Sequence, residues 1–409
     1  MSIWEKHRRC NMSVVSIQKT EGNEYEQIKK AVYKAIEDCG GLADIIKPGY
    51  KVLVKPNFVA VPKERCTGGV TRWEVTKAVA ERVREEGAEA VIAESAAAGV
   101  DTEEVIQACG YQKLRDEGFQ VIDLKSRKPA SIPTENGKVI QKMNTWDIVA
   151  DADAVISVPV MKTHDQTEVT LGMKNLKGLI ADGQKKFFHR HGVVNGVVDI
   201  IQTIKPVMTV IDGTFCQQGL GPIYGETVEM DLIVASKDVV ACDSVGSAIM
   251  GYDVNAPMIT VEAYNRGLGE KDLDKIEVKG CTIQSVARRF KRSSEVTIPG
   301  LPPYQLIFDE GACTGCRNTV ISALMDLKAG GYEKYLEGKY IVVGPVKELP
   351  EGATKDNTVL VGQCTKKLEN QGRWVPGCPP GNVFVVQGIV GDAETVGRRY
   401  SDKSEDEIG

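Results

Sequence analysis

The sequence is poor in aromatic residues, has no long apolar run and carries no excess of positive charge, and each absence excludes a class of protein. Phe, Trp and Tyr make up 6% of the 409 residues, whereas apolar residues reach 42%, an ordinary share for a globular chain. No stretch approaches the roughly 18 uninterrupted apolar residues of a membrane-spanning helix. The 51 Lys and Arg residues are outnumbered by 56 Asp and Glu residues, for a net charge of −5. We therefore expect neither a membrane span nor a nucleic-acid partner.

Signals for secretion are also missing. The first ten residues are charged, and no apolar stretch precedes a small-residue cleavage site. The 11 cysteines are an odd number spread through a large chain, so a complete disulfide framework cannot use them all. We expect a cytoplasmic protein whose cysteines are core residues, nucleophiles or metal ligands.

Short apolar runs alternate with amphipathic stretches along most of the chain. Strands are expected at 52–55, 90–94, 120–123, 154–158, 208–211 and 232–235, and helices at 71–87, 103–117, 193–204 and 239–250. Thr71 is the expected N-cap of the first helix. The alternation predicts an α/β fold of mostly parallel sheets with helices on both faces. Ligands of such sheets bind beyond the carboxyl ends of the strands.

This alternation stops between residues 291 and 303, which contain three prolines. We place a domain boundary near residue 300, between a body at 1–300 and a smaller α/β domain at 301–409. The smaller domain is expected to have strands at 304–308, 340–343 and 358–361 and a helix that ends at Leu327. The acidic tail from Ser401 is expected to be frayed.

Four cysteines of the smaller domain lie in turns rather than within strands. Cys313 and Cys316 form a Cys-x-x-Cys step, Cys364 follows a strand, and Cys378 lies in a Gly-Cys-Pro-Pro sequence. A Cys-x-x-Cys step brings two thiolates within reach of one metal centre, and small intervening residues let backbone amides turn toward sulfur. Proline after a cysteine keeps the loop from continuing as a helix. Such loops suit the bulk of an iron–sulfur cubane.

Three alternatives stay open for these cysteines: a structural zinc site, a redox dithiol, and core cysteines without a ligand. Structural zinc usually takes its ligands as two tight pairs, whereas Cys364 and Cys378 are 14 residues apart. Elsewhere, Cys39, Cys109 and Cys242 are expected in the core, and Cys66 and Cys216 in glycine-containing loops.

The smaller domain resembles the cluster-binding part of the small subunit of nickel–iron hydrogenases and the matching subunit of respiratory complex I. The shared features are Cys-x-Gly-Cys after the first strand, Gly-x-Cys after a later strand, and Gly-Cys-Pro-Pro. This resemblance implies a flavodoxin-like fold with one [4Fe–4S] cluster, whose ligands here are Cys313, Cys316, Cys364 and Cys378. The sequence departs from the pattern at 381–386, which looks like a strand where those subunits have a helix.

Basic residues and three of the four histidines gather between residues 162 and 191. Lys162 and His164 directly follow an expected strand, and Lys174 and Lys177 are expected on one helix face. Dense positive charge beside a glycine-containing turn suits a carboxylate or a phosphate. The alternative is a solvated, lysine-rich surface.

Two further loops are expected at the same edge of the sheet. Lys55 and Asn57 follow one strand, and the small residues 94–99 follow the next, where a ligand can approach the backbone closely. The candidate substrate-binding residues are therefore Lys55, Asn57, Lys174, Asn175, His189 and Arg190.

Residues 12–280 are similar to the family numbered 362 among the domains of unknown function. The similarity rests on an ordered set of motifs: Lys55-Pro-Asn57, Val158 to His164, Met173 to Gly178, His189-Arg190, Asp212-Gly213 and Gly221-Pro222. Many members carry a ferredoxin-type Cys-x-x-Cys-x-x-Cys insert, which this sequence lacks. The family is distantly similar to nickel-pincer lactate racemases, which implies a two-lobed α/β body with a cleft. The racemase histidine signature is not evident, so the resemblance implies a fold and an iron–sulfur association but no reaction.

The leading hypothesis is an iron–sulfur redox protein, and such a protein could itself be an oxidoreductase. One [4Fe–4S] cluster would pass electrons to a partner protein of ferredoxin or flavoprotein type, or to a small anionic substrate in the cleft. Four cysteine ligands saturate the cluster, which favours electron transfer over chemistry at an open iron. Lys162 and His164 are the candidate catalytic residues, which would bind and protonate a reduced substrate. The alternatives are an isomerase or lyase of a small carboxylate with a structural cluster, and a protein that delivers a cluster or metal.

Overall fold

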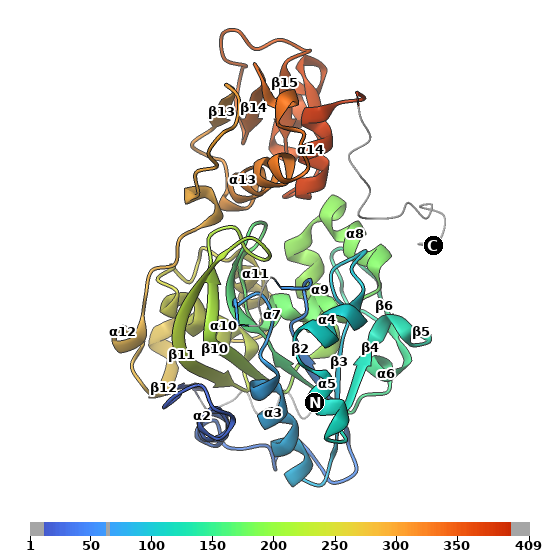
Figure 1. Cartoon of the computed structure of the whole chain (residues 1–409), viewed down its shortest axis with the longest axis vertical. Helices are drawn as coiled ribbons and strands as arrows, with labels where there is room; N and C mark the ends of the chain where they lie inside the picture. Colours follow the sequence, from blue (N-terminus) through green and yellow to red (C-terminus); the bar gives the residue numbers. More distant parts are fainter. Residues whose placement is uncertain (1–11, 63–65, 394–409) are drawn as a thin grey trace.

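A computed structural model describes residues 12–62 and 66–393. The charged N-terminal residues and the acidic tail from Ser401 lie outside these ranges. Figure 1 shows a large α/β unit below a smaller one. We call the elements from residue 13 to residue 286 the body and those from residue 305 to residue 390 the C-terminal part. No helix in the described ranges has the length and apolar character needed to cross a membrane.

The body is built on one ten-stranded sheet in the order β12-β1-β11-β10-β7-β2-β3-β4, with β8 beside β10 and β9 beside β8. Neighbours from β10 to β4 pair in parallel, as do β1 and β12, whereas β11 is antiparallel to both β1 and β10. The predicted α/β class with a mostly parallel sheet is confirmed. The strands are β1 (Ser13–Lys19), β2 (Lys51–Pro56), β3 (Glu89–Glu94), β4 (Gln120–Asp123), β7 (Ala154–Val158), β8 (Val160–His164), β9 (Glu168–Thr170), β10 (Met208–Gln218), β11 (Glu226–Ser236) and β12 (Ile276–Gly280).

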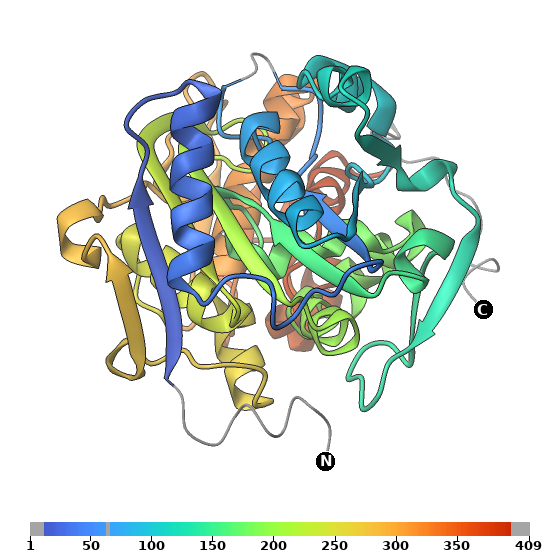
Figure 2. The ribbon, with the colours of Figure 1, turned by 90° about the horizontal axis from the view of Figure 1, so that it is seen from below.

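Helices cover both faces of this sheet because successive strand residues point to opposite sides. In β2, Val52 and Val54 pack into the core formed with α2 (Tyr25–Asp38) and α3 (Trp73–Glu85), whereas Leu53 packs into the core on the other face. Figure 2 shows α2 and α3 lying across the first face. The other helices of the body are α4 (Thr102–Ala108) and α5 (Gln112–Asp116) on that face, and α7 (Gly172–Asn175), α8 (Asp182–His191), α9 (Val193–Ile204), α10 (Val239–Ile249) and α11 (Met258–Asn265) on the other.

Shorter elements lie at the edges of the body. They are the two-stranded sheet of β5 (Pro129–Pro133) and β6 (Lys142–Trp146), the short helices α6 (Asp147–Ala150) and α12 (Ile283–Val286), and the 3₁₀ turn η2 (Leu176–Leu179), which follows α7 directly.

Two expectations for the body are wrong in detail. Thr71 does not cap α3, because the N-cap of this helix is Arg72. The Thr71 hydroxyl instead accepts a hydrogen bond from the Asn57 amide and donates one to the Val158 carbonyl. The single helix expected at 103–117 is divided into α4 and α5. Gly110 lies between them with φ of 77°, a left-handed conformation that ends the first helix.

The C-terminal part has a four-stranded parallel sheet in the order β13-β14-β15-β16. Its elements are β13 (Gln305–Phe308), α13 (Thr314–Ala329), β14 (Tyr340–Val343), β15 (Thr358–Val361), the 3₁₀ segment η6 (Gln363–Gln371), β16 (Arg373–Val375) and α14 (Asn382–Val390). The strand expected at 381–386 is therefore wrong. Tertiary packing overrides the strand propensity of its valines, because Val385, Val386 and Ile389 pack with α13 in one core.

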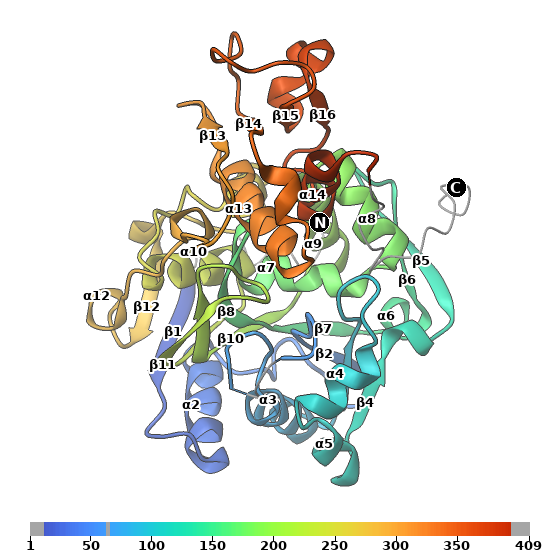
Figure 3. The ribbon, with the colours of Figure 1, turned by 45° about the horizontal axis from the view of Figure 1, so that its top comes forward.

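The C-terminal part meets the body through its helices. Figures 1 and 3 show α13 and α14 between the small sheet and the body. The Asn318 amide of α13 donates to the Glu168 carboxylate of β9 at 3.2 Å, and Leu220 of the β10–β11 loop belongs to the C-terminal core. In the described part of the chain the two sheets share no strand. The boundary near residue 300 remains a prediction.

Candidate functional site

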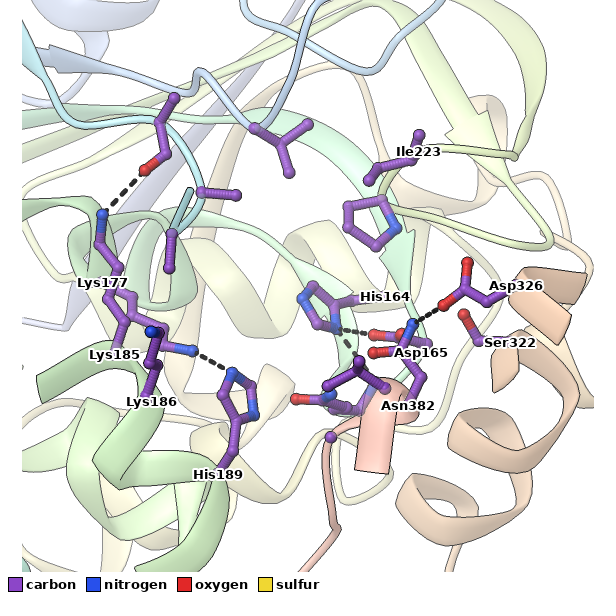
Figure 4. A pocket seen from close by; sticks show the side chains of 18 of the residues that line it. His164, Asp165, Lys177, Lys185, Lys186, His189, Ile223, Ser322, Asp326 and Asn382 are labelled. Atoms are coloured by element: carbon purple, nitrogen blue, oxygen red, sulfur yellow. Dashed lines mark hydrogen bonds and ion pairs between the residues drawn. The ribbon is translucent and has the colours of Figure 1, made fainter. Parts of the chain in front are cut away.

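A cavity of about 900 Å³ lies between the body and the C-terminal part. Its body side is formed by Asn57 and Phe58 after β2, residues 94–98 after β3, the β8–β9 turn, and the segment from α7 to α8. Ser322 and Asp326 of α13 and the start of α14 form the facing wall (Figure 4). The cavity therefore lies at the carboxyl ends of parallel strands, where the fold class predicts a ligand.

Two pairs of lysine and histidine lie in this cavity. Lys174 Nζ is 2.9 Å from His164 Nε2, and Lys177 Nζ is 2.9 Å from His189 Nε2. His164 also contacts Asp165, with 2.8 Å between Nδ1 and Oδ1 (Figure 4). Within the described ranges, no carboxylate lies within the 4.0 Å ion-pair distance of either lysine. The positive charge of the two pairs is thus not neutralised by a direct ion pair.

Burial and mutual repulsion weaken the protonated state of these groups. Burial and the nearby ammonium groups of Lys55 and Lys185 lower the pKa of Lys174 to about 8. Burial and the Lys174 ammonium lower the pKa of His164 to about 4. The pKa values of Lys177 and His189 are lowered well below their usual values for the same reasons. An anion in the cavity would favour protonation of all four groups.

Asp165 is the acidic member of this cluster. Burial opposes its charge, but His164, Lys174 and the Ser322 hydroxyl together hold the pKa of Asp165 below its usual value. Because Ser322 belongs to α13, the C-terminal part contributes directly to the electrostatics of the cavity.

A buried polar network lies beneath the cavity. The Lys55 ammonium forms an ion pair with Glu94 and donates to the side-chain oxygen of Asn175 at 2.8 Å. Asn175 in turn donates to the Lys55 carbonyl and to the Ser157 hydroxyl, both at 3.0 Å. Burial lowers the pKa of Lys55 to about 8. These contacts tie β2, β3 and β7 to α7 and fix the position of the helix that carries Lys174.

Most of the residues predicted from the sequence are brought together here. Asn57, His164, Lys174, Asn175, His189 and Arg190 all line the cavity, as do residues 94–98 of the predicted small-residue loop. Lys55 and Lys162 do not line it. Lys162 is 1% exposed and donates to the Gly69 carbonyl at 2.6 Å, so it lies beneath the surface that a ligand would touch. The catalytic roles of Lys162 and His164 remain predictions.

Several lining residues were not selected from the sequence as candidate site residues. Three of them, Lys177, Lys185 and Lys186, lie in the basic segment between residues 162 and 191. The dense positive charge of that segment could have identified them. Lys185 is held by the Ser95 hydroxyl at 2.8 Å and by Asp182 at 3.0 Å. The lining residues of the C-terminal part gave no signal, because their approach depends on packing between segments more than 100 residues apart. They include Ser322, Asp326, Tyr332, Asn382 and Phe384.

The four cysteines of the C-terminal part come from three turns. Cys313 is the N-cap of α13 and Cys316 lies in its first turn, whereas Cys364 follows β15 and Cys378 follows β16. Hydrogen bonds from the Cys316 thiol and from the amides of Cys316 and Gly315 lower the pKa of Cys313 to about 6. Its hydrogen bond with Cys313, burial, and the charges of Cys313, Cys378 and Cys364 raise the pKa of Cys316. The four thiols therefore form one electrostatic cluster.

The four cysteines offer thiolate ligands of the kind that iron–sulfur clusters take. No group of three or more His, Cys, Asp or Glu side chains in residues 12–62 and 66–393 is arranged around one metal ion. In a cubane each thiolate binds a different iron, so the four sulfur atoms need not surround a single point. A Cβ atom at Gly362 would lie 3.0 Å from Cys316 Sγ, so the chain passes close to this sulfur. Cys313, Cys316, Cys364 and Cys378 could thus hold such a cluster.

The cysteine turns lie directly behind the cavity wall. A Cβ atom at Gly315, between Cys313 and Cys316, would lie 3.1 Å from the Gln166 carbonyl oxygen and 3.3 Å from Pro379. Gln166 lines the cavity and follows His164 and Asp165. Two turns of the cysteine cluster therefore meet next to the histidine–lysine pairs.

None of the ten cysteines in the described residues forms a disulfide. Cys39, Cys109 and Cys242 are buried, as predicted. The loop predicted around Cys216 is wrong, since this residue is fully buried within the long strand β10.

Comparison with known proteins supports the predicted family. The model of the family described as "Domain of unknown function (DUF362)" matches residues 52–248, which confirms the match that the motif order predicted. The chain is 29% identical over 248 residues to the thylakoid-associated protein sll1697 of Synechocystis sp., with 58% of this chain and 75% of that protein covered.

A partial likeness to a solved structure accompanies this match. The lactate racemase apoprotein from Thermoanaerobacterium thermosaccharolyticum aligns with a TM-score of 0.38 and 14% sequence identity. The alignment covers 57% of this chain and 56% of the racemase chain, so this chain spans little more than half of that protein.

Proposed function

We propose that this chain is an iron–sulfur redox protein, in which Cys313, Cys316, Cys364 and Cys378 bind one [4Fe–4S] cluster beside an anion-binding cavity. A bound cluster would supply or accept single electrons. The observation that supports the proposal is the contact among the three cysteine-bearing turns: Gly315 lies against Pro379, Gly362 lies against Cys316 Sγ, and the Gln363 amide donates to the Gly377 carbonyl at 2.9 Å.

The start of α13 favours thiolate ligands. Cys313 and Cys316 lie at the N-terminus of a 16-residue helix, where backbone N–H groups and the helix dipole stabilise negative charge. Gly362 lets the chain pass close to Cys316 Sγ, and Gly315 lets the first turn of α13 approach Pro379, the residue after Cys378. These features support a cluster site over isolated core cysteines.

The cavity residues would serve a bound anionic substrate. Reduction adds negative charge to such a substrate, and the Lys174 and Lys177 ammonium groups would stabilise that charge and could donate protons to it. His164 lies between Lys174 and Asp165, and its Nδ1 accepts the Gln166 amide at 3.0 Å, so a proton transfer through the ring to Asp165 would require this hydrogen bond to break. Electrons would come from, or go to, a protein partner of ferredoxin or flavoprotein type.

The test is reductive EPR spectroscopy on the full chain purified without oxygen. We expect a reversible S = 1/2 signal in the native protein, and loss or conversion of this signal in Cys378→Ser. The matched control is Cys281→Ser, which changes a partly buried cysteine of the body and should leave the signal intact. A native protein without such a signal, or a Cys378→Ser variant that retains it unchanged, would contradict the proposal.

The same preparation separates the alternative functions. An isomerase or lyase with a structural cluster would convert a small carboxylate without an electron donor, and its cluster would resist reduction. A delivery protein would transfer its cluster to an apoprotein acceptor. If the cluster cannot be reduced reversibly, either of these two results would contradict the redox function and support the corresponding alternative.

A further inference from the structure

The cavity is large for the small anion that the basic segment first suggested. Its volume of about 900 Å³ lies near the upper end of the roughly 300–1,000 Å³ range of sites for drug-sized ligands. An anion the size of acetate or phosphate would contact only one end of it. A ligand that fills the cavity would contact both its basic side and its apolar side.

One side of the cavity carries positive charge with a defined geometry. Lys177 and His189 form a pair at 2.9 Å, and the second ring nitrogen of His189, Nδ1, is buried without a hydrogen-bond partner in the described structure. When Lys177 is protonated, it donates to Nε2, and the neutral ring then carries its proton on Nδ1. The N–H group and the ammonium lie at opposite ends of the ring, so a carboxylate can accept from one of them, and the other is left for a second polar group of the ligand.

The charge of the lining favours a singly charged group over a dianion. Glu94 and Asp165 both line the cavity and are buried, at 1% and 4% exposure. The Glu94 charge is balanced by the Lys55 ammonium, whereas the Asp165 carboxylate repels additional negative charge at short range. A carboxylate group thus fits this side better than a phosphate dianion.

The other side of the cavity is apolar and partly aromatic. Leu220, Ile223 and Tyr224 come from the β10–β11 loop, and Tyr332 and Val386 from the C-terminal part, whereas the Phe384 ring lies next to Arg190 at the basic side, 5.6 Å from its guanidinium. Ile223 is 42% exposed, so its apolar surface is accessible to a ligand in the cavity. Figure 4 shows Ile223 on the side opposite Lys177, Lys185 and Lys186. Apolar surface in this position is suited to an apolar part of a ligand.

Polar acceptors lie between the two sides. Gln166 is 5% exposed and lines the cavity, and its side-chain oxygen has no hydrogen-bond partner in the described structure. The side-chain oxygen of Asn57, another lining residue, also lacks one. Buried acceptors without partners are costly, so a ligand that donates hydrogen bonds here would gain affinity.

We propose that the cavity binds an amphiphilic organic acid. Its carboxylate would face Lys177 and His189, and its bulky apolar or aromatic body would lie against Ile223, Tyr224 and Val386. This proposal rests on the part of the proposed function that assigns the cavity to an anionic substrate, and it replaces the small anion by a larger chemical class.

Isothermal titration calorimetry with matched probes tests this proposal. The probes are 2-naphthoate, its neutral analogue 2-naphthamide, acetate and inorganic phosphate, each titrated into the full chain purified without oxygen. We expect 2-naphthoate to bind at least about tenfold more tightly than any other probe, because it alone combines the charge with the apolar body. Equal affinity for acetate, or for 2-naphthamide, would overturn the proposal, as would the absence of 2-naphthoate binding.

Variants locate the two ends of the ligand. Lys177→Gln should weaken 2-naphthoate about tenfold and leave 2-naphthamide unchanged, since it removes a charge-assisted bond. Ile223→Ala should weaken 2-naphthoate and leave acetate unchanged. Lys30→Gln, at an exposed lysine of α2, is the matched control and should alter neither. Unchanged 2-naphthoate affinity in both cavity variants would place the ligand elsewhere.

The outcome is independent of the cluster. The comparison of probes on the unsubstituted chain needs no variant to fold. Tight 2-naphthoate binding by a chain without iron would refute the redox function and leave the ligand class standing. A reducible cluster in a chain that does not bind 2-naphthoate would support the redox function and refute the proposed ligand class.

Discussion

The lysine side chains around the cavity are the most unusual groups at the scale of single residues. Lys55, Lys162 and Lys185 are each buried, and each has partners of its own: a carboxylate for Lys55 and Lys185, and a backbone carbonyl for Lys162. Lys174 and Lys177 instead face imidazole rings. Burying an ammonium without a counter-ion is costly, so a bound anion is the natural complement of these two residues.

Anion binding should therefore depend on pH. The pKa of Lys174 is about 8 in the free protein, where it faces Asp165, His164, Lys55 and Lys185, and a bound anion would raise it. The affinity for 2-naphthoate should fall as the pH rises above 8, by up to about tenfold per pH unit, because binding then requires proton uptake. Titrations in buffers of different ionisation enthalpy measure both the affinity and the proton uptake.

The matched variant for this prediction is Lys174→Arg. Arginine stays charged throughout this pH range, so the variant should lose the share of the pH dependence that comes from Lys174, whereas the share from Lys177, whose pKa is also lowered, should remain. An unsubstituted chain whose affinity stays constant between pH 7 and pH 9.5 would show that Lys174 does not sense the ligand.

At the scale of elements, the crossing of η2 over the end of β3 determines the shape of the cavity floor. A Cβ atom at Gly178 would lie 1.8 Å from the Glu94 carboxylate and 2.7 Å from Lys55 Nζ. These atoms belong to a buried ion pair and cannot move away cheaply. The Ser95 hydroxyl also donates to the Gly178 carbonyl at 2.6 Å, which fixes η2 in place.

We expect Gly178→Ala to lower the free energy of unfolding by about 3 kcal/mol or more, because the methyl group must displace a buried ion pair. Urea unfolding followed by circular dichroism measures the change. Gly69→Ala is the control, since the nearest atom to its Cβ would be at 3.6 Å, and its effect should stay within about 0.5 kcal/mol. Equal stability of the two variants would mean that η2 does not lie against Glu94.

The elements also show what the sequence could predict. The strand at 154–158 and the helix at 193–204 were predicted with their observed bounds, because each has a clear apolar pattern between breaking residues. The failures have local physical causes. A left-handed glycine divides the helix at 103–117, Thr71 bonds to two strand ends instead of a helix, and valines at 381–386 pack as a helix.

At the scale of the whole molecule, the site is a joint product of two segments far apart in the sequence. Residues at the carboxyl ends of β2, β3 and β8 could be predicted to line the site, because parallel strands bring these ends to one edge of the sheet. The contributions of Ser322, Tyr332 and Phe384 could not, since they depend on how α13 and α14 pack on the body. Lys162 was selected by position alone, and its burial was invisible in the sequence.

The family match and the proposed chemistry concern different parts of the chain. The matched residues 52–248 include the basic side of the cavity, whereas all four cysteines lie beyond them. The proposed electron-transfer function thus depends on the C-terminal part, and the family match does not bear on it.

The most direct test is the iron and acid-labile sulfide content of the full chain purified without oxygen. We expect about four iron atoms and about four sulfides per chain, held by four cysteine thiolates. A chain that carries one zinc ion, or no metal and no sulfide, would contradict the account.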